Sequence, residues 1–395
     1  MKDYIMLFQN KEFQIFSSLI ISLIISVASI PVIINISKLK DLMAEIELRS
    51  SHETLTPTLG GVAIFAATLI SYFIWDNPYE GHEIHLAVAD LIILFFLGIK
   101  DDILILSPKK KLLIQIAASM LLITLGDLRI NSLYGLLGIN NIPYFISILF
   151  TTFIFISLIN AINLLDGIDG LAGTVGVMAS LCFGYLFYSL SLFAHATLAF
   201  SLAGSLIGFL RYNWSIKNKI FMGDTGSLIV GFLLSFFAIK YIVLNSAYLY
   251  NPQLGNDAPI LAMLILILPL FDTLRMFIIR LLAKKSPFEG DRNHLHHIVI
   301  DQGISHMAAT AWLVGCNCIL LIAYFYFKPS FSNLEFISTT LVLFGIYCIL
   351  AFILGKRIQD KDRLKFTKID KIKRLQIVDE KKIKEQLTSK ELPND

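Results

Sequence analysis

The chain has 395 residues, of which 56% are hydrophobic and only 16% are charged, and its mean hydropathy is +0.70. A soluble globular domain is about 45–50% apolar and about 25% charged, so this composition excludes an ordinary soluble domain and indicates a polytopic membrane protein. The net charge of only +3 gives no basis for a nucleic-acid partner, and none is expected.

Apolar stretches recur along most of the chain, and a helix needs about 20 apolar residues to cross the hydrocarbon core of a bilayer. We predict an all-α, polytopic membrane domain over residues 1–355, with about eleven transmembrane helices in a lipid bilayer. The first stretch has no clear small-residue cleavage site, so we interpret it as a retained helix rather than a signal peptide. In chain order, the predicted helices are 13–36, 58–75, 86–100, 111–127, 144–162, 171–190, 192–212, 225–246, 258–280, 307–328 and 335–355.

Residues 356–395 differ from the rest, because thirteen Lys or Arg occur there together with many Asp and Glu. We predict that this segment is a soluble, partly helical cytosolic tail. Most other Lys and Arg lie in the loops after the first, third, seventh and ninth predicted helices. Basic residues mark cytoplasmic loops, so the amino terminus is predicted to be outside and the carboxy terminus in the cytosol.

The polar motifs of the chain share one feature, since each lies in a loop predicted to be cytosolic. The loops on the other side carry no comparable motif. This one-sidedness predicts a site at which several helix ends meet, supplied with a substrate from the cytosol. The motifs are RSSHETLTPTLGG (49–61), KDDILILSPKKK (100–111), NAINLLDGIDGLAG (160–173), NKIFMGDTGS (218–227) and KKSPFEGDRNHLHH (284–297).

Five aspartates in these motifs are the first candidates for chemistry. Asp101 and Asp102 are adjacent, and the simpler interpretation is a pair of solvated anions balanced by the lysines that follow. Asp166 and Asp169 are three residues apart and share a face of a helical turn. Asp224 comes immediately before a predicted helix. The alternative for Asp169 and for Asp224 is a purely structural role, in which the side chain caps the start of the following helix.

Taken together, these carboxylates point to a divalent cation. Five of them at one membrane face would repel each other without cations, and Mg²⁺ prefers carboxylate and amide oxygens together with substrate phosphates. The sequence has no Walker-type glycine loop with its lysine, which argues against a P-loop NTPase. It also has no G-x-S-x-G nucleophile elbow.

The HLHH sequence at 294–297 has three interpretations. A zinc site is one, although no third well-spaced ligand accompanies the histidines. A solvated loop is the second. The third is recognition of substrate phosphates and sugar amides by imidazole and guanidinium groups. The candidate residues are Asp291, Arg292, Asn293, His294, His296 and His297.

In this order, TPTLGG, DD with following lysines, NAINLLDGIDGLAG, FMGDTGS, PLFDTLRMFIIR and SPFEGDRNHLHH resemble the motifs of one enzyme family. They are similar to those of the polyprenyl-phosphate N-acetylhexosamine-1-phosphate transferases, of glycosyltransferase family 4 type, which begin bacterial cell-envelope glycan synthesis. The resemblance covers about residues 37–300. It implies a multi-pass protein of the bacterial inner membrane whose active site faces the cytoplasm. It leaves room for a homodimer.

The resemblance also implies a reaction and a cofactor. Such an enzyme transfers a sugar 1-phosphate from a UDP-N-acetylhexosamine to undecaprenyl-phosphate with Mg²⁺ and releases UMP. Asp224 and Asn163 resemble the Mg²⁺ ligands. Asp166 resembles the residue near the metal and the diphosphate, and Asp169 resembles the residue that contacts the uracil.

Two further roles follow from the same resemblance. Asp101 is similar to the proposed catalytic base that deprotonates the lipid phosphate, with Asp102 beside it as a second catalytic residue. The DRNHLHH loop, with Arg292, His294, His296 and His297, resembles the loop that reads the sugar.

Two branches of the family differ in their motifs. The muramoyl-pentapeptide transferases carry a lysine shortly before TPT and a triple histidine. Here Glu53, Thr54 and Leu55 precede Thr56, and the histidine motif is HLHH. Both features resemble the N-acetylglucosamine-1-phosphate branch. The muramoyl-pentapeptide branch and other UDP-N-acetylhexosamine donors remain alternatives.

A transporter is the alternative from a different class of protein. Asp272 and Arg275, near Pro269, would then be the charges along the transport path. Transporter sites lie near the bilayer midplane, whereas the polar motifs of this chain are all predicted at one interface. The sequence therefore favours the transferase.

Overall fold

The computed structural model describes residues 10–40, 56–75, 82–104, 106–133, 138–247, 257–284, 294–327, 334–335, 337–351 and 353–354. The regular elements in these ranges are helices, which confirms the all-α class. They are α2 (Lys11–Leu39), α3 (Gly60–Ile74), α4 (His82–Leu104), α5 (Pro108–Leu125), α6 (Tyr144–Leu165), α7 (Leu171–Ser189), α8 (Phe193–Asn213), α9 (Gly223–Ala247), α10 (Ala258–Ile265), α11 (Ile267–Leu282), α12 (Leu295–Ile300), α13 (His306–Phe327) and a further helix, Ile337–Ala351.

Within the described residues, seven helices are long and apolar enough to cross a membrane, or eight if α10 and α11 form one bent span. The seven are α2, α4, α6, α7, α8, α9 and α13. Two of the predicted spans correspond to shorter apolar helices, α3 and Ile337–Ala351. The protein is therefore a multi-pass membrane protein, but the predicted number of eleven spans is not confirmed.

One predicted helix is wrong in shape. The stretch 258–280 is not continuous, because α10 and α11 meet at Leu266 with a bend of 82°. Pro269 explains the break: it has no N–H to donate to the carbonyl of Ile265, and its ring would collide with that carbonyl in a straight helix.

Two of the helices that extend further than predicted, α4 and α6, bring polar motifs onto helix ends. α4 continues to Leu104, so the two adjacent aspartates lie in its last turn rather than in a loop. α6 continues to Leu165, so Asn163 is helical and Asp166 is its C-cap residue.

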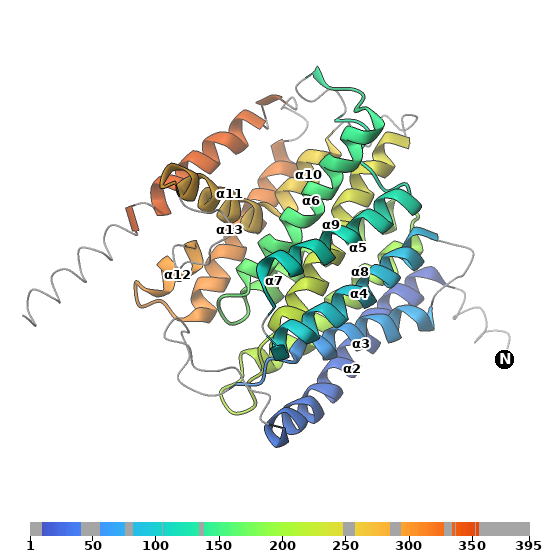
Figure 1. Ribbon diagram of the computed structural model, residues 1–395, viewed down its shortest axis with the longest axis vertical. Coiled ribbons are helices and arrows are strands. Elements are labelled where there is room, and N and C mark those ends of the chain that lie inside the picture. The colour runs from blue at the N-terminus through green and yellow to red at the C-terminus, as the bar shows by residue number, and fades with distance from the viewer. Residues whose placement is uncertain are drawn as a thin grey trace, which may run out of the picture.

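The helices pack as a bundle around α8 and α9, which are the most buried of the seven candidate spans. α8 packs against α2, α7 and α3, while α9 packs against α6, α4 and α3. In Figure 1, α11, α12 and α13 lie on one side of this bundle and α2 and α3 on the other. The C-terminal ends of α4 and α6 and the N-terminal ends of α5 and α9 meet at one end of the bundle, where the motif side chains contact each other.

The orientation of this end in the membrane stays a prediction from the basic residues, as does the cytosolic tail at 356–395, which lies outside the described residues. A reporter fused after Asp395 should read out in the cytosol, and a reporter inserted near Asn251 should read out on the external face. Paired phosphatase and fluorescent reporters would measure this. An external signal from the fusion at the carboxy terminus would contradict the predicted orientation.

Candidate active site

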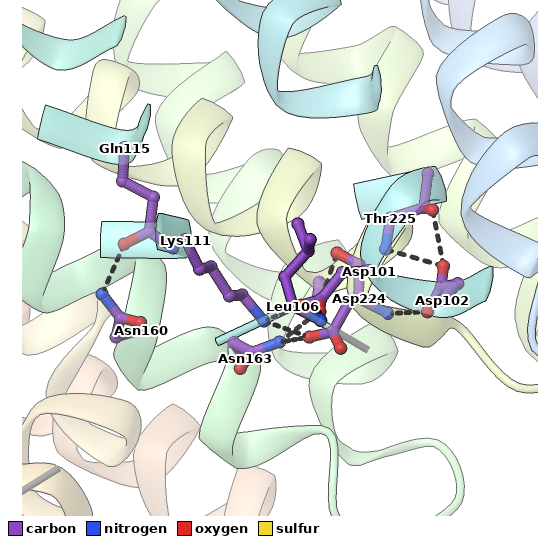
Figure 2. A network of polar contacts seen from close by, with 10 residues as sticks. Asp101, Asp102, Leu106, Lys111, Gln115, Asn160, Asn163, Asp224 and Thr225 are labelled. Atoms are coloured by element: carbon purple, nitrogen blue, oxygen red, sulfur yellow. Dashed lines mark hydrogen bonds and ion pairs between the residues drawn. The ribbon is translucent and has the colours of Figure 1, made fainter. Parts of the chain in front are cut away.

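The start of α9 is held by a side chain from another helix. Asp102, in the last turn of α4, accepts hydrogen bonds from the backbone amide of Asp224 at 2.7 Å and from the backbone amide of Thr225 at 3.0 Å. Its carboxylate also accepts the hydroxyl of Thr225 at 2.5 Å (Figure 2). The first N–H groups of a helix have no partner inside the helix, so Asp102 caps α9 and fixes the position of Asp224.

Small residues let the neighbouring helices approach this cap. Gly98, one turn before Asp102 on α4, lies so close to Thr225 that a Cβ would overlap its backbone. On α3, a Cβ at Gly61 would overlap the backbone at Gly226, and the Gly61 amide donates to the carbonyl of Met222 at 2.9 Å. Gly61 of the TPTLGG motif therefore lets α3 pack closely against the start of α9.

Lys111 joins two of the predicted aspartates. Its ammonium lies 2.5 Å from Oδ1 of Asp224 and 3.0 Å from Oδ2 of Asp101. The other oxygen of Asp101 accepts the backbone amide of Leu106 at 2.6 Å. The side chain of Asp101 is only 7% exposed, whereas that of Asp224 is 34% exposed. Asp101 is thus held inside the protein, while Asp224 stays accessible to a ligand.

Asn163 meets Asp224 as the resemblance implied, although the two are far apart in the sequence. Its side-chain amide nitrogen donates to Oδ1 of Asp224 at 2.6 Å and to the hydroxyl of Ser227 at 2.7 Å. One turn earlier on α6, Asn160 donates to the side chain of Gln115 on α5 at 2.9 Å (Figure 2). Rotating the Asn163 amide by half a turn would present its oxygen to a cation held by Asp224.

The carboxyl group of Asp166 has no hydrogen bond or ion pair with another residue in the described ranges, while its backbone amide caps α6. Burial raises the pKa of Asp166 well above its ordinary value, and the nearby carboxylates of Asp224, Asp102 and Asp169 raise it further. Such a carboxylate is stabilised in its charged form by a cation.

The donor set at this end of the bundle fits a divalent cation that also binds substrate. The described residues contain no group of three or more His, Cys, Asp or Glu side chains arranged to hold a metal by themselves. Mg²⁺ does not need such a group, because it commonly takes one or two carboxylates and fills its other positions with water and substrate phosphates. Asp224, Asn163 and Asp166 offer oxygens of the right kind.

Asp169 is held by two residues that the sequence did not single out. Its Oδ2 atom lies 2.6 Å from the ammonium of Lys219 and 2.9 Å from Nδ1 of His306. Lys219 belongs to the NKIFMGDTGS motif, so attention to that motif could have found it. His306 lies outside every motif and only the packing of α13 brings it there.

The histidine segment, which we define as residues 294–297, is held by Asp272 of α11. Oδ2 of Asp272 lies 2.7 Å from Nδ1 of His294, and Oδ1 accepts the backbone amide of Leu295 at 2.9 Å. Arg275 lies 3.7 Å from the same carboxylate. Asp272 and Arg275, the two charges that a transporter would need along its path, therefore pair locally. Asp272 also holds the start of α12.

Two of the histidines contact residues 166–170 between α6 and α7, which we call the aspartate loop. The rings of His296 and His297 lie against Gly167, where a Cβ would overlap the ring of His296. Burial lowers the pKa of His296 to about 3, so this ring is neutral at physiological pH. The predicted Arg292, with residues 291–293, lies outside the described residues.

Residues 84–242 match the family model described as "Glycosyl transferase family 4". The chain is 32% identical over 270 residues to the undecaprenyl-phosphate alpha-N-acetylglucosaminyl 1-phosphate transferase of Haemophilus influenzae, covering 66% of this chain and 72% of that protein. The chain belongs to glycosyl transferase family 4. The proteins of the same name from Escherichia coli K12 and Yersinia pestis are 27% and 26% identical, over 80% and 76% of this chain and 85% and 82% of those proteins.

Membership of glycosyl transferase family 4 confirms the resemblance to the polyprenyl-phosphate N-acetylhexosamine-1-phosphate transferases and to their N-acetylglucosamine-1-phosphate branch. The matched region runs from the start of α4 to within α9. It contains Asp101, Asp102, Lys111, Asn163 and Asp224. The part of this transferase that the family model matches is therefore the part that forms the carboxylate cluster.

Proposed function

We propose that the chain transfers N-acetylglucosamine 1-phosphate from UDP-N-acetylglucosamine to undecaprenyl-phosphate and releases UMP, at the cytoplasmic face of the bacterial inner membrane. This would be the first membrane step of cell-envelope glycan synthesis. The observation that carries the proposal is the set of groups around Asp224, in which Lys111 and Asn163 meet the carboxylate beside the buried Asp101. The names of the relatives supply the acceptor and the transferred N-acetylglucosamine 1-phosphate, and UDP as its carrier is part of the proposal.

The proposed reaction is a phosphoryl transfer. An oxygen of the lipid phosphate forms a bond to the phosphorus that carries the sugar, and the bridging P–O bond to UMP breaks and leaves its electron pair on UMP. Such reactions depend mainly on positioning and on neutralising phosphate charge. Lys111 lies where its ammonium can turn from the two carboxylates toward a bound diphosphate.

The proposed cofactor is Mg²⁺, held by Asp224 and Asn163 with Asp166 close by. When bound, it would supply positive charge to the diphosphate and so stabilise the leaving UMP. Asp101 is proposed as the base that takes the proton from the lipid phosphate. Its buried position, with one oxygen fixed by the Leu106 amide, keeps the carboxylate in one orientation for that transfer.

The proposed sugar site is the histidine segment. The neutral ring of His296 can donate or accept a hydrogen bond, which suits the hydroxyl and acetamido groups of a sugar. Arg292 is proposed to contact the sugar or its phosphate from just before this segment. A pentapeptide-bearing donor would have to protrude through this segment, so the smaller donor is favoured.

A side-by-side donor assay tests the proposal. Purified protein with undecaprenyl-phosphate should release UMP faster from UDP-N-acetylglucosamine than from the muramoyl-pentapeptide donor, with UDP-N-acetylgalactosamine as a third arm. Arg292→Ala should weaken transfer more than UMP binding, by about 1.5–3 kcal/mol for a lost charged hydrogen bond. Faster turnover of the pentapeptide donor would overturn the proposed donor.

Arg129→Ala is the matched control for that assay. Arg129 follows the far end of α5 and pairs with the exposed Asp127 at 2.7 Å. An α-helix rises about 1.5 Å per residue, so the helix from Lys111 to Leu125 places this pair about 20 Å from Lys111. Its removal is expected to leave both donor preference and turnover unchanged.

A further inference from the structure

Two side chains in the first two turns of α13 form hydrogen bonds with Asp169 in the aspartate loop. Nδ1 of His306 lies 2.9 Å from Oδ2 of Asp169. One turn later, the hydroxyl of Thr310 donates to the backbone carbonyl of Asp169 at 3.2 Å. α13 therefore holds both the side chain and the main chain of residue 169, which is 137 residues away from His306.

The contact between His306 and the carboxylate depends on one tautomer of the ring. With a proton on Nδ1, the ring donates to Oδ2 of Asp169 at 2.9 Å. An unprotonated Nδ1 would turn its lone pair toward this oxygen and could accept only the backbone amide of Asp169, at 3.3 Å. The geometry therefore favours the proton on Nδ1, which ties α13 to the side chain of residue 169.

The rest of the loop is fixed from the other side by the end of α8. The amide of Gly170 donates to the side chain of Asn213 at 2.6 Å. Gly170 has a φ of 81° and lies against the indole of Trp214, where a Cβ would overlap the ring. With the backbone held at both ends, the direction of the Asp169 carboxylate depends on the groups that contact it, among them Lys219 and His306 at Oδ2.

These side chains lie at the border of the buried region. The side chains of Asp169, Lys219 and His306 are 13%, 21% and 21% exposed, and Oδ1 of Asp169 is buried. A carboxylate at such a position can accept the N–H of a pyrimidine base. A carboxylate whose direction is set before binding loses less conformational freedom when the ligand arrives, which increases affinity.

We propose that His306 is a positioning residue for the nucleotide, which holds Asp169 in the direction in which it meets the uracil of the donor. This inference rests on the proposed function, in which Asp169 contacts the base. It extends the nucleotide site to α13, beyond the 84–242 region that the family model matches. It also assigns His306 to base recognition, through its contact with Asp169, rather than to the chemistry at Asp224.

The test compares His306→Ala with His306→Asn in the purified full-length protein. Calorimetry would measure the Kd of UMP, and steady-state assays would measure kcat and the KM values of UDP-N-acetylglucosamine and undecaprenyl-phosphate. His306→Ala should raise the Kd of UMP and the KM of the nucleotide sugar by about tenfold, the size of one lost hydrogen bond to a charged group. The KM of the lipid phosphate and the value of kcat should change by less than about threefold.

His306→Asn is the conservative variant, because the amide nitrogen of asparagine can take the place of Nδ1. It should recover most of the UMP affinity, which a merely structural role for the ring would not give. Thr310→Val, which keeps the shape and removes the hydroxyl, should weaken UMP binding in the same direction and covers a failure of His306→Ala to fold. His82→Asn, at an exposed histidine on the far end of α4, is the control.

The outcomes separate this inference from the proposed function. Unchanged UMP affinity in His306→Ala and Thr310→Val, with an active wild type, would overturn the role of His306 alone. A fall in kcat without a change in UMP affinity would do the same. A wild type that neither binds UMP nor turns over UDP-N-acetylglucosamine would overturn the proposed function itself.

Discussion

Purified Asp224→Asn protein should lose turnover of UDP-N-acetylglucosamine by about 10³-fold or to below detection. Asparagine keeps the shape of the side chain and removes its charge, so residue 224 can no longer offer a carboxylate to a divalent cation. The fold should survive, because Asp102 caps the backbone of residue 224 rather than its side chain. UMP release at millimolar Mg²⁺ and thermal unfolding in detergent would measure the two effects.

Asp127→Asn is the matched control for this substitution. It makes the same chemical change at a side chain that is 75% exposed, beyond the far end of α5. Asp127 has a φ of 47°, which asparagine adopts readily, so the control should fold normally and keep wild-type turnover. Wild-type turnover by Asp224→Asn itself would rule out the assignment of the cation to this residue.

The second large effect is expected from Asp101→Asn, which should lower kcat by about 10²–10⁴-fold while UMP still binds. The asparagine oxygen can still accept the Leu106 amide, so the local backbone should hold. What is lost is the negative charge that could take a proton from the lipid phosphate. The loss of this charge also leaves Lys111 paired with Asp224 alone.

Measurement of kcat together with the Kd of UMP tests whether Asp101 is the catalytic base. A loss of only a few-fold would exclude a role as catalytic base. If Asp101→Asn lost UMP binding while kcat stayed unchanged, Asp101 would have a role in binding the donor rather than in activating the lipid phosphate.

The family resemblance implied that Asn163 and Asp224 lie together, and the structure brings the two within hydrogen-bond distance. The cap that Asp102 provides was not predicted, because capping signals in a sequence lie next to the helix that they cap. Here the capping carboxylate comes from a different helix, 122 residues earlier in the chain. The sequence shows such a residue only as a polar group near a helix end.

The bend at Leu266 and the contact of His306 with Asp169 were not predicted, for two different reasons. Hydropathy counts apolar residues along the chain and contains no information about direction, so α10 and α11 were predicted as one straight span despite Pro269. His306 follows the last motif and has no spacing signal. Its contact with Asp169 depends on how α13 packs beside the loop, which is a property of the tertiary structure.

The contact between α4 and α9 restricts how this part of the protein can vary in length. Gly98 and Asp102 lie one helical turn apart on α4 and together contact Thr225, one by close approach and the other by hydrogen bonds. One residue inserted between them would rotate Asp102 by about 100° around the helix axis. Both contacts could not then be kept, so insertions and deletions that preserve the enzyme must fall outside this turn of α4.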